Sequence, residues 1–238
     1  MFHGNYESST PPPRPRHVVL QEFGLKPGTP VVSCLGNLRA YKGLELAVKA
    51  ASELGGDVQL LIGGKPHPGV ALDSIKSIKR ERGADDGVVI IARQLSAQEF
   101  SDALSVSEAV LLPYRNITTS GALLAAWTQG CGVIASDLPY FRELLENDPA
   151  AGMLFPCGDA PELAKAIARY ISIPAEQRRA AALRSASLYP WDKCIRPVAA
   201  VLRSWSRGAA THARLTESPS EVPRVPKFEM VGGSINLR

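Results

Sequence analysis

We expect an α/β fold for this chain: a single Rossmann-like domain with a parallel sheet and helices on both faces. Short apolar runs rich in β-branched residues alternate with segments of helical periodicity from about residue 30 onward. This alternation is typical of parallel strands joined by crossover helices. The region is also long enough for one core, because a domain of ~150 residues buries about 70% of its extended surface.

Five short apolar runs are predicted as strands, at residues 31–35, 58–62, 88–92, 109–112 and 133–135, and a further short apolar run lies at residues 153–155. The first reads Val-Val-Ser-Cys-Leu and is apolar at almost every position. Strands that are buried on both faces of a parallel sheet have such near-continuous apolar composition.

The segments between and beyond these runs are predicted as helices, at residues 42–54, 70–82, 96–104, 120–129, 140–146, 161–173, 175–188 and 191–205. In the first of them, apolar residues include Leu44, Ala47, Val48, Ala51 and Leu54. Spacings of three and four residues place such side chains on one buried helix face.

The two ends of the chain differ from the middle. Residues 1–16 end in Thr-Pro-Pro-Pro-Arg-Pro-Arg, which favours an extended conformation and predicts a linker or a surface strap. Residues 17–206 are predicted as the Rossmann-like domain, with a helical C-terminal end. Residues 207–238 are poor in apolar side chains and rich in Ser, Pro and Arg, so we expect a disordered tail.

Composition and charge argue against several classes of partner. The net charge is +4, but residues 203–238, with six basic and three acidic side chains, account for most of it. No basic face with interleaved aromatic residues is found, so we expect no nucleic-acid partner. No apolar run approaches the ~20 residues of a transmembrane helix. The first residues do not resemble a secretory signal. We expect a cytoplasmic protein, with peripheral membrane contact as an open alternative.

The sequence gives no sign of a metal or of a bound cofactor. The four cysteines, Cys34, Cys131, Cys157 and Cys194, form no C-x-x-C pair and are expected to be reduced. No Asp-x-Asp pair and no clustered histidines are present. The dinucleotide fingerprint G-x-G-x-x-G and the P-loop are both missing.

Two loops carry the residues that point to chemistry. In residues 36–43, Arg39 and Lys42 lie three apart before a helix, where cations oppose the helix dipole unless an anion binds. In residues 112–121, Thr119 and Ser120 can cap the next helix, and Gly121 leaves its backbone N–H groups accessible. A solvated surface pair and a simply well-capped helix are the alternatives. Because both loops follow strands at one sheet edge, we predict a single anion site.

Four blocks of the sequence resemble a known family. In order they are Gly36-x-x-Arg39-x-Tyr41-Lys42-Gly43, Leu61-Ile62-Gly63-Gly64, Leu112-Pro113-Tyr114-Arg115-x-Ile117-x-x-Ser120-Gly121 and Gly130-x-x-Val133-Ile134-Ala135-Ser136 with Glu143. Together they resemble the C-terminal donor-binding domain of group 1 glycosyltransferases. These form family 4 of the retaining, two-Rossmann-domain GT-B type, so the fold expected is one half of GT-B.

The resemblance implies roles for individual residues. Arg39 and Lys42 match the catalytic residues that hold the diphosphate of a nucleotide sugar, without a metal or cofactor. The remaining matches are substrate-binding positions: Gly36 and Asn37 in the first loop, Arg93, Gln94 and Leu95 beside the base, Thr119, Ser120 and Gly121 at the second phosphate contact, and Glu143 near the donor sugar. Glu143 has a second interpretation, an acid stabilised by the dipole at a helix start.

The sequence departs from the family in two respects. The positions of a glutamate pair found in many relatives are occupied by Ile117 and Ala125. The chain also begins where the second domain of such enzymes begins, so we expect catalysis to need a partner polypeptide that supplies the acceptor domain. The apolar stripe of the helix at 191–205 is similar to the family's terminal helix, which braces that domain.

Three functions follow from the resemblance. The first is transfer of a hexose from a nucleoside diphosphate sugar to a glycan or a lipid-linked acceptor, with retention, in polysaccharide biosynthesis. The second is a non-catalytic nucleotide-sugar-binding module, or a truncated remnant. The third is an epimerase of the same fold, which needs extra acid and base residues that the sequence does not reveal.

Overall fold

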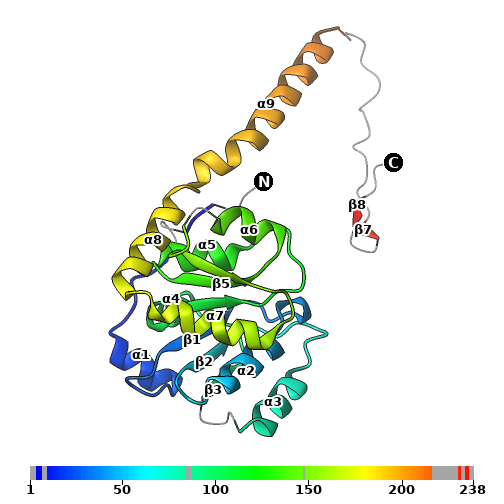
Figure 1. Cartoon of the computed structure of the whole chain (residues 1–238). Helices are drawn as coiled ribbons and strands as arrows, with labels where there is room; N and C mark the ends of the chain where they lie inside the picture. Colours follow the sequence, from blue (N-terminus) through cyan, green and yellow to red (C-terminus); the bar gives the residue numbers. More distant parts are fainter. Residues whose placement is uncertain are drawn as a thin grey trace. The chain divides into compact units, whose positions relative to one another are not determined.

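The fold is described from a computed structural model. It describes residues 4–6, 10–83, 87–146, 148–215, 230–231 and 234–235. The chain divides into two compact units, Met1–Ile195 and Arg196–Arg238. The first unit contains the sheet and nearly all of the helices, and it is the unit in which the candidate site lies (Figure 1).

Six parallel strands form the sheet of the first unit, in the order β3-β2-β1-β4-β5-β6. Their bounds are β1 Val31–Leu35, β2 Gln59–Gly63, β3 Val88–Ile91, β4 Ala109–Leu112, β5 Gly132–Ser136 and β6 Gly152–Phe155. The bounds of β1 to β5 agree within one or two residues with the five predicted strands, and β6 forms from the short apolar run at 153–155. Every pairing is parallel. The predicted α/β fold with a parallel sheet is confirmed.

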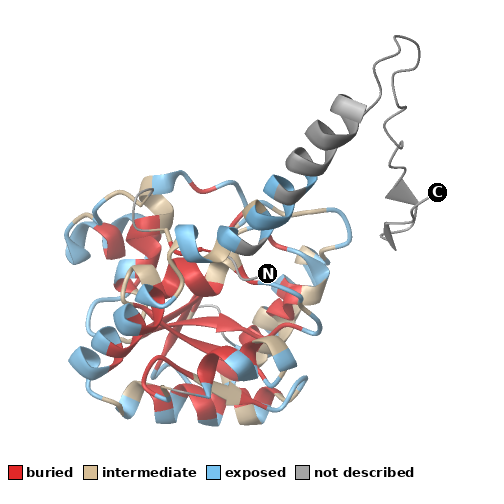
Figure 2. Cartoon of the chain, turned by 90° about the horizontal axis from the view of Figure 1, so that it is seen from above, coloured by how far each residue is buried: buried red, intermediate tan, exposed pale blue. Residues whose placement is uncertain are grey.

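Alternate residues of each strand enter two separate cores. In β1, Val31 and Leu35 pack into one cluster, whereas Val32 and Cys34 pack into the other. This period of two follows from the pleat of a strand. Burial on both faces explains why these strands contain few polar residues. The four inner strands β2, β1, β4 and β5 are buried along their length (Figure 2), whereas the edge strands β3 and β6 are partly exposed.

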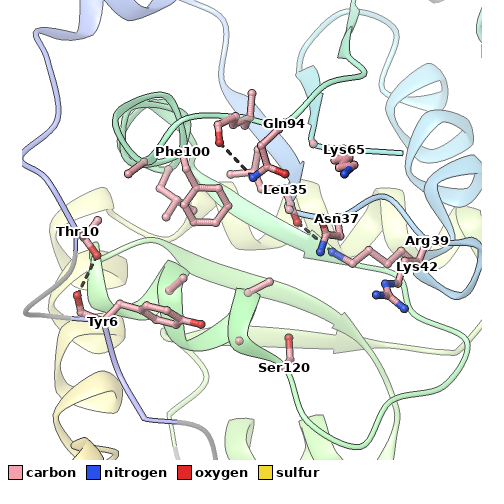
Figure 3. A pocket seen from close by; sticks show the side chains of 18 of the residues that line it. Tyr6, Thr10, Leu35, Asn37, Arg39, Lys42, Lys65, Gln94, Phe100 and Ser120 are labelled. Carbon is pink, nitrogen blue, oxygen red and sulfur yellow. Dashed lines mark hydrogen bonds between the residues drawn. The ribbon is translucent and has the colours of Figure 1, made fainter. Parts of the chain in front are cut away.

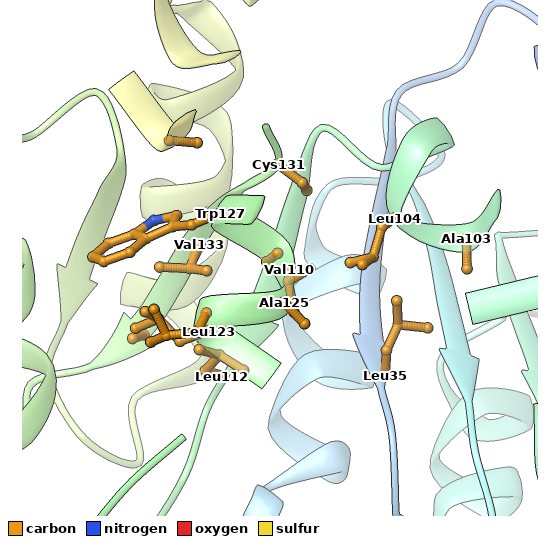
Figure 4. Packing of buried hydrophobic residues seen from close by; sticks show 14 of the residues in the cluster. Leu35, Ala103, Leu104, Val110, Leu112, Leu123, Ala125, Trp127, Cys131 and Val133 are labelled. Atoms are coloured by element: carbon orange, nitrogen blue, oxygen red, sulfur yellow. The ribbon is translucent and has the colours of Figure 1, made fainter. Parts of the chain in front are cut away.

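The helices cover both faces of the sheet. Helices α1 Arg16–Phe23, α4 Ala97–Val106, α5 Gly121–Thr128, α6 Pro139–Leu145 and α8 Ala175–Ser187 contribute to the first core. Helices α2 Leu44–Glu53, α3 Leu72–Glu81 and α7 Ala160–Ser172 contribute to the second. Figure 4 shows how Leu104, Leu123 and Trp127 of the first core pack around strand residues such as Leu35 and Val133.

Two helix predictions need correction. Helix α1 was not predicted, although Pro15 precedes it and Gly24 ends it in the left-handed conformation at φ 67°. Its short sequence buries only Val19, Leu20 and Phe23, too few for a clear helical period. The helix expected from residue 42 begins at Leu44, and a 3₁₀ turn, η1 Ala40–Lys42, precedes it.

The C-terminal part of the chain is helical beyond the expected limit. Helix α9 Trp191–Leu215 extends into the segment for which disorder was expected. The rest of residues 207–238 lies outside the described residues, apart from an antiparallel pair, β7 Met230–Val231 and β8 Ser234–Ile235. Among the described helices, none combines the length and the apolar character needed to cross a membrane.

Candidate functional site

The middle of the sheet places two loops next to each other. Strands β1 and β4 are neighbours in the middle of the sheet. The chain continues from β1 toward the edge formed by β3, and from β4 toward the opposite edge, formed by β6. In open parallel sheets, ligands bind at this point, outside the carboxyl ends of the strands. The loops that begin there are residues 36–43 and 113–120, the two in which the anion site was predicted.

Several contacts join the two loops. Gly43 has the left-handed φ of 62° and lies so close to Pro113 that a Cβ would overlap the Pro113 carbonyl oxygen. The backbone N–H of Arg115 donates to the carbonyl of Tyr41 at 2.8 Å. The Arg115 guanidinium also reaches Glu45 of α2 at 2.5 Å. The loops therefore form one structural unit.

Lys42 is the buried cation of this unit. Its side chain is only 8% exposed, and its ammonium donates to the carbonyl of Leu35 at 3.1 Å and lies 5.5 Å from the centre of the Tyr114 ring. Burial lowers the pKa of Lys42 to about 8; nearby Cys34 opposes the shift and Arg39 adds to it. Lys42 makes no salt bridge with any described residue, so a bound anion would stabilise its charged form.

Arg39 lies at the entrance of the same loop. It precedes η1 in an extended conformation, and its side chain is exposed. Gly36, at the start of the loop, has φ 89° and donates its N–H to the carbonyl of Gly63 at 3.0 Å. A Cβ on Gly64 would overlap the Gly36 carbonyl oxygen. Because Gly36 and Gly64 have no side chains, the loops after β1 and β2 can pack closely against each other.

The second loop ends at the N-terminus of α5. Ser120 is buried and caps this helix, accepting the N–H of Leu123 at 3.3 Å. Gly121 is the first residue of the helix. The first backbone N–H groups of a helix have no partner within it, and its dipole favours an anion there. The α5 N-terminus can therefore bind a phosphate group.

One cavity of about 680 Å³ brings these groups together (Figure 3). Nine of the predicted site residues line it: Gly36, Asn37, Arg39, Lys42, Gln94, Leu95, Thr119, Ser120 and Gly121. The cavity therefore presents three cations, Arg39, Lys42 and Lys65, and a helix N-terminus to one space. That arrangement can bind a diphosphate, with Arg39 and Lys42 on one side and α5 on another.

Two predicted residues do not line the cavity. Arg93 is exposed and its guanidinium pairs with Glu99 at 2.6 Å, within the first turn of α4. This pairing holds the pKa of the Glu99 carboxyl down at about 2. Glu143 is exposed on α6.

Several cavity residues were not predicted, namely Tyr6, Thr10, Pro11, Lys65, Phe100 and Tyr114. Lys65 follows β2, so the position of ligands beyond strand ends could have indicated it. Tyr6, Thr10 and Pro11 belong to the N-terminal segment, far from the site in sequence. No periodicity or spacing in the sequence links them to it.

The side chains that commonly bind metal ions are scarce among the described residues around the cavity. Its described lining contains no aspartate, glutamate or histidine. Elsewhere in the part of the chain that the structure describes, no group of three His, Cys, Asp or Glu side chains is placed to hold a metal ion. All four cysteines are free.

The sequence of this chain is similar to that of a known protein family. The family model of glycosyl transferases group 1 matches residues 29–172. Over 164 residues the chain is 30% identical to the alpha-D-kanosaminyltransferase of Streptomyces kanamyceticus. The matched region covers 68% of this chain and 41% of that protein.

Solved structures share the fold. The sucrose-phosphate synthase of Thermosynechococcus elongatus matches with TM-score 0.70 and 20% identity, covering 83% of this chain and 50% of that one. Anabaena Alr3699/HepE in complex with UDP and glucose matches with TM-score 0.70 and 18% identity, covering 79% and 52%. The chain thus spans about half the length of these relatives. The six-stranded parallel sheet and the solved structures agree with the family match in fold. Because the family model matches more than half of its length, this chain belongs to the group 1 glycosyltransferases.

Proposed function

We propose that this chain is the donor-binding half of a retaining glycosyltransferase. Its cavity would hold a nucleoside diphosphate sugar, with the diphosphate between Arg39, Lys42 and the N-terminus of α5. The observation that carries this proposal is the buried Lys42 ammonium, 3.1 Å from the carbonyl of Leu35 at the end of β1 and in the same cavity as Ser120 and Gly121. Asn37, Gln94 and Leu95 would contact the rest of the donor.

The chemistry follows from the charges. When the bond between the anomeric carbon and the diphosphate oxygen breaks, its electron pair stays on that oxygen and negative charge grows on the leaving group. Arg39, Lys42 and the α5 dipole would stabilise that charge, and such preorganised groups are commonly worth ~3 to 4 kcal/mol each. In this mechanism no metal and no further cofactor takes part.

The acceptor side is the second part of the proposal. We infer a hexose as the group transferred and a glycan or a lipid-linked molecule as the acceptor, in the cytoplasm and in polysaccharide biosynthesis. Positioning the acceptor and excluding water need a second wall opposite the cavity. A separate acceptor-domain polypeptide would supply that wall. The non-catalytic binding module is the second candidate, and it is favoured because the described residues of the lining include no carboxylate and no imidazole.

Calorimetric titration with UDP and with GDP tests the donor site. We expect at least one of them to bind the intact chain. The double variant Arg39→Ala with Lys42→Ala should bind it at least 100-fold more weakly, because each charged hydrogen bond is worth about 1.5 to 3 kcal/mol. Lys165→Ala with Arg169→Ala removes the same charge from the exposed face of α7 and should change nothing. Equal affinity in both double variants would refute the site.

A transfer assay separates the two candidates. The chain is mixed with a labelled nucleotide sugar and glycan and lipid-linked acceptors, with and without a lone acceptor-domain polypeptide. Labelled product that depends on Lys42 supports the transferase. Tight donor binding without product in either mixture supports the binding module.

A further inference from the structure

The N-terminal strap, residues 4–6 and 10–16, forms one wall of the cavity. Three of its residues, Tyr6, Thr10 and Pro11, line the same space as Arg39 and Lys42. None of them was expected there, and the donor chemistry described above uses none of them.

Tyr6 is held directly over helix α5. Its backbone N–H donates to the hydroxyl of Thr128 at 3.1 Å, and its carbonyl accepts the hydroxyl of Thr10 at 2.9 Å. Thr128 shares a face of α5 with Ala125 and Ala122, three and six residues before it, and both alanines line the cavity. The Tyr6 side chain is half-buried and packs against the first core, which includes Ala125 and against which Ala122 also packs.

The described residues nearest to Tyr6, Gly4 and Asn5 before it and Thr10 and Pro11 after it, are held by contacts within the chain. Before it, the Asn5 N–H donates to the carbonyl of Tyr189 at 2.8 Å, and Gly4 lies under the indole of Trp191, which a Cβ would overlap. After it, the hydroxyl of Ser101 on α4 donates to the carbonyl of Pro11 at 2.6 Å. The ring is therefore placed before a ligand arrives.

The strap is also tied to α4 further along. The backbone N–H and the Nε of Arg14 each donate to a carboxylate oxygen of buried Asp102 at 2.7 Å. Gln98 of α4 donates to the carbonyl of Pro12 at 2.9 Å. The wall that carries Tyr6 is thus part of the folded unit.

The cavity has two chemically different ends. Figure 3 shows Tyr6 and Phe100 at the end opposite Arg39 and Lys42. The cavity lining also includes the apolar side chains of Leu104 and Ala125, and the polar residues Thr10 and Gln94 lie near Tyr6 and Phe100. A ligand with a diphosphate at the cationic end would extend its nucleoside toward the aromatic end, where the flat face of a base can pack on an aromatic ring.

We infer that Tyr6 is a specificity-determining residue of the donor site, whose ring packs against the nucleoside. The inference rests on the proposed function, because it requires the diphosphate at Arg39 and Lys42. It assigns to the N-terminal strap the recognition of the nucleoside, whereas the loops after β1 and β4 recognise the charge. The ring carries the contact, and the phenol hydroxyl is not required.

Binding measurements with two kinds of probe, nucleoside diphosphates and inorganic pyrophosphate, test this inference. The intact chain, Tyr6→Ala and Tyr6→Phe are titrated with UDP, GDP, ADP and dTDP, and with inorganic pyrophosphate. Tyr6→Ala should weaken binding of the preferred nucleoside diphosphate roughly 5- to 100-fold, the range for losing one base–aromatic stack. Pyrophosphate affinity should stay unchanged. Tyr6→Phe should keep the affinity for both probes within about twofold, since the ring remains.

The outcomes separate the inference from the proposed function. If Tyr6→Ala binds nucleoside diphosphates as well as the intact chain does, while Arg39→Ala with Lys42→Ala binds neither probe, the inference is wrong and the proposed function stands. If Tyr6→Phe loses as much affinity as Tyr6→Ala, ring packing is also wrong. If the intact chain binds no nucleoside diphosphate, the proposed function fails first.

A spectroscopic measurement avoids reliance on Tyr6→Ala folding. The chain has six tyrosines, and labelling their rings with carbon-13 gives one set of signals for each. The Tyr6 signals are those missing from Tyr6→Phe. They should shift when UDP or the preferred nucleoside diphosphate is added and stay in place with pyrophosphate. Signals that do not move with the nucleotide would overturn the inference.

Discussion

Gly43 and Pro113 are in backbone contact, and this contact joins the two loops of the site. A Cβ on Gly43 would overlap the carbonyl oxygen of Pro113. Gly43 ends the 3₁₀ turn that carries Lys42, and Pro113 begins the loop that leads to Ser120. The distance between the buried ammonium and the N-terminus of α5 therefore depends on a position without a side chain.

Gly43→Ala should separate the loops. The substitution strains a left-handed backbone, at about 1 to 2 kcal/mol, and also pushes against Pro113. Gly55→Ala is the matched control, because Gly55 has φ 60° and nothing within 4 Å of its Cβ position. Thermal unfolding should show the larger loss in Gly43→Ala, and UDP titration should show weaker binding there alone. Equal losses of stability would mean that the contact with Pro113 is unimportant.

Lys42→Met should stabilise the free protein while abolishing tight donor binding. Burial lowers the pKa of Lys42 from 10.5 to about 8, so at pH 7 the charged form lowers the free energy of unfolding by on the order of 3 kcal/mol. This destabilisation is fully present below pH 8 and disappears as the pH rises toward 10.5. Urea unfolding should therefore show a gain for Lys42→Met at pH 7 that shrinks above pH 8.

Donor binding should weaken at alkaline pH for the same reason. As the pH rises past 8, Lys42 loses the proton that makes it a cation, and a diphosphate gains less from contact with it. UDP affinity of the intact chain should fall between pH 8 and 9.5. In Lys42→Met the affinity should be low and flat over that range; a similar fall in the variant would assign the effect to another group.

Asp102→Asn should loosen the strap. Burial alone would raise the pKa of Asp102, but hydrogen bonds from Arg14 and Gln98 outweigh burial and bring it below the ordinary 3.8. Loss of these charged hydrogen bonds should lower the free energy of unfolding by about 2 kcal/mol at pH 7. The stabilisation exists above pH 4 and is lost as the pH falls further, so the difference between the two proteins should shrink in acid.

Asp73→Asn controls for charge in that experiment. Asp73 is fully exposed and its partner Lys76 is 3.8 Å away, so its removal should change the unfolding free energy by less than about 0.5 kcal/mol. A loss as large as that of Asp102→Asn would show that net charge, not the strap, determines the effect.

Ser120→Ala should affect both stability and binding. The hydroxyl of Ser120 caps α5, and a lost cap lowers stability by about 1 kcal/mol. Asp159 caps α7 in the same way, accepting the N–H of Glu162 at 2.9 Å, and does not line the cavity. Thermal unfolding should show similar losses for Ser120→Ala and Asp159→Ala. UDP affinity should fall only in Ser120→Ala. A fall in both variants would show that losing a helix cap weakens binding whether or not the cap lines the cavity.

The sequence brought the two loops of the candidate site together for a physical reason that applies to all parallel sheets. Strand ends on one edge are neighbours, so the order of the runs ending at Leu35 and Leu112 was enough to place their loops together. That rule says nothing of where a side chain points. Arg93 follows β3 on the same edge, yet its guanidinium pairs with Glu99.

The sequence by itself determined the strands, most of the helices, the family and the cationic loop, because local periodicity and short motifs are written in neighbouring residues. Only the tertiary structure decided that Lys42 is buried, that Gly43 touches Pro113, and that Tyr6 forms a wall of the cavity. These features depend on packing between segments that are far apart in the sequence; Tyr6 and Thr128, which are hydrogen-bonded, are 122 residues apart. Such packing has no period that a linear pattern can show.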